Sequence, residues 1–152
     1  MKLFEIVCSG APYFAQIPAL KGMFCLQQKF WAEFVTDNGV FRLDLFPGWI
    51  TDYRSGSSIV DAIVPKKGNE KYNATIFMHD ACYSGHLSKK LADFFLLEGM
   101  KMAGIASWRA QLAYDAVRIA GASSYFALDD TMPRPYRYNR DFERLHINAK
   151  AT

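Results

Sequence analysis

The chain has 152 residues, of which 51% are hydrophobic and 15% aromatic, and its formal net charge is +3. This length and composition predict one folded domain with a packed core and exclude disorder over most of the chain. The net charge is too small to indicate nucleic acid, and no apolar run reaches membrane-spanning length. The three cysteines form no C-x-x-C pair, which excludes zinc-ribbon and thioredoxin motifs. The first residues lack the apolar core of a signal peptide, so we expect a cytoplasmic chain.

Short strands are predicted before residue 52. The clearest signal is a hairpin: residues 29–36 are rich in aromatic and β-branched residues, and residues 40–46 alternate apolar with polar side chains. Asp37-Asn38-Gly39 lies between them, and Asn-Gly is typical of a tight hairpin turn. The other expected strands are 3–8, 23–26 and 49–51.

Three helices are predicted in the second half, after a loop at residues 52–71. They cover residues 72–84, 88–103 and 108–120. Ser88 and Ser107 are suitable N-caps, and Gly104 and Gly121 follow the last residues of two of these helices. In the third helix the buried stripe is expected to consist of Trp108, Leu112, Ala116 and Ile119.

The helical periodicity of apolar residues ends after Ser123. The expected architecture is therefore a single α+β domain over residues 1–125, in which an antiparallel hairpin or meander precedes three helices, followed by an extended C-terminal arm at 126–152. Residues 132–152 hold five basic and two acidic side chains, and so carry the whole net charge. Such tails dock on partners or stay solvated. The Pro, Tyr and Arg residues of 134–138 suit docking on protein better than stacking on bases.

A polar cluster interrupts the first predicted helix. His79, Asp80 and Tyr83 lie in an otherwise apolar stretch, where polar groups are costly unless each finds a partner. On a helix His79 and Tyr83 share a face, being four residues apart. Asp80 is rotated by about 100° from His79, so we expect it to point elsewhere and not to orient the imidazole.

Asp93 on the next helix is the expected partner of His79, because the residues around it on its helix face are apolar. If the two helices run antiparallel through residues 85–87, Asp93 approaches the imidazole. Asp93 would then hold the tautomer of His79, and His79 would act as a general base towards water. Asp80, with Asp52 and loop carbonyls, would be free to bind a hard cation through oxygen.

Other interpretations of these residues stay open. Hydrogen bonds among His79, Tyr83 and Asp93 can equally form a polar lock between two helices. A zinc site at His79 and His86 is less favoured, because the H-E-x-x-H arrangement is absent. The serines at 57–58 lack the G-x-S-x-G frame of a nucleophile, and Cys82 is expected to be a small core residue.

Several weak motifs occur in a characteristic order: Trp49–Asp52, Gly56–Ile59, His79–Tyr83, Ser88–Phe95, Trp108-Arg109 and Tyr114–Arg118. Together they resemble a family of small phage and prophage proteins of unknown function, which shows T-D-G-A-S-I-P, then H-D-x-x-Y, an A-D helix and a W-R helix ending near V-R. The resemblance covers about residues 45–125. Residues 53–55 separate Asp52 from Gly56, and Val60 replaces the usual proline. The resemblance to the phage family implies a virion-associated or accessory protein in the host cytoplasm or the virion. Its partners would be other phage structural proteins, which bind residues 132–152.

A more distant resemblance covers about residues 76–100. The H-D-x-x-Y motif at 79–83, followed by Asp93 on the next helix, is similar to the calcium-dependent bacterial secreted phospholipases of the A-two class. It implies that His79 activates water, Asp80 binds calcium and Asp93 orients His79. The connection is shorter here, and the family's disulfides and secretory signal have no counterpart. The alternative function is therefore a hydrolase of host lipid or cell-envelope bonds, with membrane contact expected only in that case.

Overall fold

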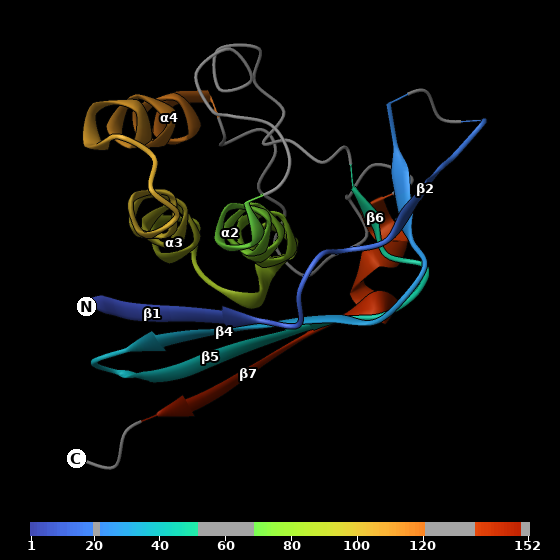
Figure 1. The fold of residues 1–152 in the computed structure, drawn as a ribbon, viewed down its shortest axis with the longest axis horizontal. Helices are drawn as coiled ribbons and strands as arrows, with labels where there is room; N and C mark the ends of the chain where they lie inside the picture. The colour runs from blue at the N-terminus through green and yellow to red at the C-terminus, as the bar shows by residue number, and fades with distance from the viewer. Residues whose placement is uncertain (20–21, 52–68, 121–135, 150–152) are drawn as a thin grey trace.

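An antiparallel sheet with helices on one face forms the described part of the molecule (Figure 1). The computed structural model describes residues 1–19, 22–51, 69–120 and 136–149. Helices α2 (Glu70–Ala81) and α3 (Lys89–Met102) lie over the sheet, and α4 (Ser107–Ala120) packs against α3. The expected α+β class, with strands followed by three helices, is confirmed.

The main sheet has four strands in the order β1-β4-β5-β7, all paired antiparallel. These are β1 (Leu3–Cys8), β4 (Phe30–Thr36), β5 (Gly39–Leu45) and β7 (Glu143–Ala149). The predicted hairpin joins β4 and β5, with Thr36 opposite Gly39. Gly39 has a φ of 122°, a conformation that glycine adopts without strain, which is why the turn falls there.

A second sheet of three short strands lies beside the first. It consists of β2 (Phe14–Gln16), β3 (Phe24–Leu26) and β6 (Ile50–Thr51), in the order β2-β3-β6. The sequence predicted β3 and β6 but not β2, whose three residues are too few to show an alternating pattern. This sheet brings Thr51 towards the end of α2, where its hydroxyl contacts Asp80.

Of the two predicted N-caps, Ser88 caps α3, whereas the prediction for Ser107 is wrong: Ser107 is the first residue of α4, and the N–H groups of Arg109 and Ala110 bond to the carbonyl of Ala106. The Ser88 side chain accepts a hydrogen bond from the backbone N–H of Leu91 at the start of α3. Asn69 caps α2 in the same way by accepting from Tyr72, so this helix begins two residues earlier than predicted. A short π-helix, η1 (Cys82–His86), continues α2, and Gly85 there has a φ of 94°. This wider turn reverses the chain towards α3.

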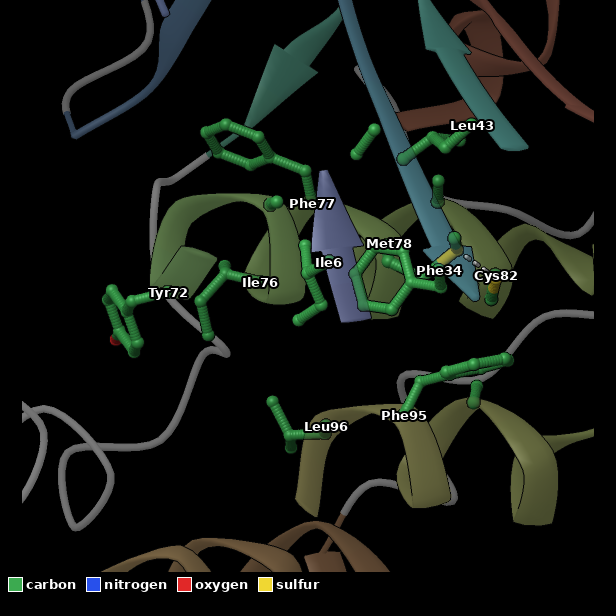
Figure 2. Close-up of a cluster of buried hydrophobic side chains, with 14 of the residues drawn as sticks. Ile6, Phe34, Leu43, Tyr72, Ile76, Phe77, Met78, Cys82, Phe95 and Leu96 are labelled. Atoms are coloured by element: carbon green, nitrogen blue, oxygen red, sulfur yellow. Dashed lines mark hydrogen bonds between the residues drawn. The ribbon is translucent and has the colours of Figure 1, made fainter. Parts of the chain in front are cut away.

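The core lies between the main sheet and helices α2 and α3, as Figure 2 shows for side chains of β1, β4, α2 and α3. Phe77 of α2 makes edge-to-face contacts with Phe30 and Trp49, at ring-centroid distances of 5.3 and 5.5 Å. Phe34 of β4 contacts Phe95 of α3 in the same manner at 5.4 Å. These aromatic contacts fix α2 and α3 on the sheet and thereby the residues that follow Phe77.

Helix α4 turns a different face inward from the one expected. Trp108, Leu112 and Ile119 are exposed, by 64%, 42% and 83%, so the predicted buried stripe is wrong except for the half-buried Ala116. The buried residues of α4 are Ala110, Ala113 and Val117. These small side chains let α4 lie close to α3, whereas the prediction assigned the inward face to the largest apolar residues.

The C-terminal residues belong to the sheet. Tyr136–Phe142 form a 3₁₀ helix, η3, and Glu143–Ala149 form β7, which pairs with β5 along its whole length. The expectation of an extended arm does not describe these residues. The sequence did not show the strand, because its alternating pattern is short, highly charged and preceded by several Pro and Arg residues. Residues 126–135 and 150–152 of that arm lie outside the described residues.

Candidate functional site

His79 and Asp93 meet as predicted. Helices α2 and α3 fold back on each other, and His79 Nε2 lies 2.9 Å from Asp93 Oδ1. Both residues are buried, with 2% and 0% of their surfaces exposed. A buried carboxylate at this distance fixes both the orientation of the imidazole and the nitrogen that carries its proton. The spatial assumption made from the sequence is confirmed.

Tyr83 completes the same hydrogen-bond group. Its hydroxyl donates to the Oδ1 atom of Asp93, the oxygen that His79 also contacts. The rings of Tyr83 and His79 are 4.2 Å apart. Burial, reinforced by the hydrogen bond to Asp93, raises the pKa of Tyr83 far above its usual value, so the phenol remains a donor. Tyr83 lies in η1, the turn that links α2 to α3.

Two cations hold the other oxygen of Asp93. Lys89 Nζ lies 2.8 Å and Arg118 Nη1 lies 3.0 Å from Asp93 Oδ2, and Lys89 also donates to the carbonyl of Val117. The sequence did not assign either residue to the site. Lys89 precedes Asp93 by four residues on one helix, a spacing that could have indicated the pair. Arg118 carried no such signal, because its contact depends on how α4 packs against α3.

The electrostatic balance keeps Asp93 ionised. Burial by itself would raise the pKa of this carboxyl, but hydrogen bonds from His79, Lys89 and Tyr83 outweigh it and hold the pKa well below its usual range. For His79, burial opposes protonation, whereas the carboxylates of Asp80 and Asp93 favour it, and the net effect raises the pKa of the imidazole. The group is therefore arranged to stabilise a protonated His79.

The second nitrogen of His79 has no hydrogen-bond partner. Nδ1 is buried and unpaired, and the nearest carboxylate oxygen, Asp80 Oδ1, lies 3.9 Å away. This distance is too long for a direct hydrogen bond. The expectation that Asp80 points away from His79 is wrong in this respect, because an imidazole has a nitrogen on each side and the two carboxylates flank the ring.

Asp80 itself is held by Thr51, whose hydroxyl donates to Asp80 Oδ2 at 3.2 Å. Burial raises the pKa of Asp80, His79 and Thr51 oppose that rise, and the negative charge of Glu143 adds to it. The side chain of Asp80 is 25% exposed, which makes it more accessible than His79.

The predicted cation site is only partly described. Asp52 lies outside the described residues. Within residues 1–19, 22–51, 69–120 and 136–149, no group of three or more His, Cys, Asp or Glu side chains is arranged to hold a metal ion. Calcium takes six to eight oxygen ligands, as a rule, and the described residues offer it Asp80 with Thr51 beside it. These residues alone do not make a calcium site.

A second buried carboxylate, which the sequence did not indicate, lies near this site. Glu143 has 2% of its surface exposed and accepts a hydrogen bond from Trp49 Nε1 at 2.8 Å. Its other oxygen lies 3.1 Å from His86 Nε2. His79 and His86 thus pair with different carboxylates, and Cys82 is a core residue as expected. Burial, with the charge of Glu143 nearby, raises the pKa of the Cys82 thiol well above its usual value.

The fold and the site together define an α+β protein with a buried histidine–aspartate pair between helices α2 and α3. The chain belongs to the family described as "Protein of unknown function (DUF1353)", whose model matches residues 24–117 and so more than half of the chain. This family match agrees with the expectation of a family of unknown function. The search of curated proteins and the search of solved structures returned no match. Among the described residues, no helix has the length and apolar character needed to cross a membrane.

Proposed function

We propose that the protein is a hydrolase in which His79 is the general base and Asp93 orients it. One observation carries this proposal: Asp93 occupies Nε2 of the imidazole, while Nδ1 is buried without a hydrogen-bond partner. With the proton fixed on Nε2, the lone pair of Nδ1 is free to accept a proton from water. A purely structural histidine would be expected to pair both nitrogens, because an unpaired buried nitrogen costs stability.

The position of Asp80 supports a place for the reacting water. Nδ1 and Asp80 Oδ1 are 3.9 Å apart, a separation that one water molecule can bridge with a hydrogen bond to each. Nδ1 then takes a proton from this water as its oxygen forms a bond to the acyl carbon of an ester. When the tetrahedral intermediate collapses, the bond to the alcohol breaks and the imidazolium returns the proton to the leaving oxygen.

Asp93 stabilises the imidazolium that forms in the first step. Its ionised state is maintained by Lys89 and Arg118, and Tyr83 donates to it without competing for the proton. The resemblance to calcium-dependent phospholipases indicates esters of host lipid or of the cell envelope as the substrate class. A cation near Asp80 would supply charge stabilisation, and its remaining ligands would have to come from residues such as Asp52, outside the described ranges.

The test is release of fatty acid from phosphatidylglycerol vesicles in calcium-containing buffer. We expect the wild-type chain and a His146→Ala control, which alters an exposed histidine on β7, to release fatty acid equally. His79→Ala should abolish release while keeping a cooperative unfolding transition at a lowered melting temperature, because the substitution also removes a buried partner of Asp93. Release that survives His79→Ala, or no release by the wild type, would remove the hydrolase proposal.

A second candidate function is favoured by a specific observation. Asp93 is fully buried and bonded to His79, Tyr83, Lys89 and Arg118 at once, which is how a polar lock between three helical elements would be built. In this case the protein is a phage virion-associated or accessory protein, found in the host cytoplasm and in the particle. Its partners would be other phage structural proteins, reached through residues 132–152.

The two candidates differ in what His79→Ala does to folding. A lock predicts that the variant loses its cooperative unfolding transition, whereas a catalytic histidine predicts loss of activity with folding retained. Mass spectrometry of purified particles, which shows whether this chain is present, tests the virion role independently.

A further inference from the structure

The C-terminal segment is joined to the strand that leads into the candidate site. Asn139 of η3 is buried, with 5% of its surface exposed. Its side-chain oxygen accepts the backbone N–H of Ile50 at 2.9 Å, and its side-chain nitrogen donates to the carbonyl of Ile50 at 2.7 Å. Ile50 belongs to β6, which pairs with β3 on its other side. Asn139 therefore binds β6 as a neighbouring strand would.

Glu143 fixes Trp49, the residue that precedes Ile50. Its carboxylate accepts the indole N–H of Trp49 and contacts His86 at the end of the π-helix. Trp49 is fully buried against Phe77 of α2. One acidic side chain thus connects the start of β7, the entry to β6 and the turn that follows Tyr83.

Asp80 is the next group in this chain of contacts. Trp49 and Ile50 are held by Glu143 and Asn139, and the following residue, Thr51, donates its hydroxyl to Asp80. Thr51 is 1% exposed, so its hydroxyl has little freedom once β6 is fixed. The Asp93 side of His79, in contrast, is held by Tyr83 of η1, Lys89 of α3 and Arg118 of α4.

We propose that Asn139 and Glu143 are positioning residues that hold the Asp80 side of the site through β6. Both lie beyond residue 117, where the family match ends, so this part of the site comes from a segment outside the matched region. The inference rests on the proposed function only in giving Asp80 a role beside the reacting water. Whether Asn139 and Glu143 hold the Asp80 side chain in place can be tested without a substrate.

The experiment is an NMR measurement of side-chain χ1 couplings for Asp80 and Asp93 in the full-length chain. In the wild type we expect one staggered rotamer for each residue. In Asn139→Ala the population of the native Asp80 rotamer should fall to about half, because β6 is then held less firmly, Thr51 is no longer fixed against Asp80, and the Asp80 side chain spreads over the staggered wells. Asp93 should keep its single rotamer. Asn148→Ala, on the exposed side of β7, is the matched control and should change neither residue.

Glu143→Met and Glu143→Gln provide a second comparison if Asn139→Ala fails to fold. Methionine preserves volume but removes both acceptors, whereas glutamine keeps an acceptor for Trp49. Asp80 should therefore lose its single rotamer in Glu143→Met and regain it in Glu143→Gln. Unchanged Asp80 couplings, or equal loosening of Asp80 and Asp93, would overturn the proposal. Absence of fatty-acid release by the wild type would remove the proposed hydrolase while leaving this measurement decisive for positioning.

Discussion

Replacement of Asp93 by asparagine is the sharpest perturbation of the buried group. The change keeps the size of the side chain but removes the charge that His79, Tyr83, Lys89 and Arg118 share. The oxygen of the asparagine amide can still accept a hydrogen bond. Its NH₂ group cannot, because it is a donor and would face the donor groups that the second carboxylate oxygen accepts from in the wild type.

The expected cost is dominated by the two buried partners. Lys89 and Arg118 have 18% and 38% of their side chains exposed and can turn to water, so each contributes at most about 1 kcal/mol. His79 and Tyr83 cannot reach water as easily, and each hydrogen bond to a charged group is worth about 1.5–3 kcal/mol. With one of these two bonds retained and up to about 1 kcal/mol lost from each cation, Asp93→Asn should lower the free energy of unfolding by about 1.5–5 kcal/mol, which overlaps the range expected for breaking a buried pair.

The pH dependence has a defined sign. The pKa of Asp93 is lowered from 3.8, so its stabilisation is complete above that value and is lost as the pH falls towards the folded-state pKa. Burial opposes protonation of His79, but the neighbouring carboxylates raise its pKa above 6.5, so its contribution is present below that value and is lost as the pH rises through the raised one. The difference in the free energy of unfolding between the wild type and Asp93→Asn should be largest between about pH 4 and 6.5.

Urea unfolding from pH 3 to pH 8 measures this gap. Asp115→Asn, which changes an exposed acid on α4, is the control and should stay within about 0.5 kcal/mol of the wild type. If Asp93→Asn costs under about 1 kcal/mol at pH 5, or if the gap does not depend on pH, the charge of Asp93 does not organise this group and the reasoning is refuted.

Two further predictions concern the packing of the helices. Gly99→Ala should destabilise the protein by about 1–3 kcal/mol, because the new Cβ would overlap the hydroxyl and methyl groups of Thr75 where α2 and α3 cross; thermal unfolding of Gly99→Ala and of its double variant with Thr75→Ala checks this, and absence of any rescue would contradict it. Val117→Ala should cost about 2 kcal/mol, whereas Ile119→Ala should change stability by under about 0.5 kcal/mol, since Val117 is 4% and Ile119 is 83% exposed. The reverse order in urea unfolding would mean that α4 turns the face predicted from sequence inward.

The local patterns of the chain predicted most of the regular structure. The Asn38-Gly39 turn fixed the hairpin, and Ser88 and Gly104 marked the ends of α3 as expected. The orientation of α4 was not predictable from periodicity, because Trp108, Leu112 and Ile119 form as regular a stripe as the smaller residues that are buried. Size alone does not determine which face of a helix is inside when close packing against a neighbour favours alanine.

The candidate site was predicted where its parts lie on adjacent helices. His79, Tyr83 and Asp93 come from segments joined by a tight turn, so helix geometry was enough to bring them together. Glu143 and Arg118 were missed because long-range packing delivers them, from β7 and α4, to positions that no local spacing encodes. Asp80 was misplaced because only one side of the imidazole was considered.

The protonation of the His79 ring is the most direct test of the account. Long-range ¹H–¹⁵N correlation spectra of the imidazole, recorded at a pH where the ring is neutral, identify the nitrogen that carries the proton. The account predicts a proton on Nε2, facing Asp93, and an unprotonated Nδ1. A neutral ring with its proton on Nδ1 would contradict it, because Asp93 would then not orient the histidine and no lone pair would face Asp80.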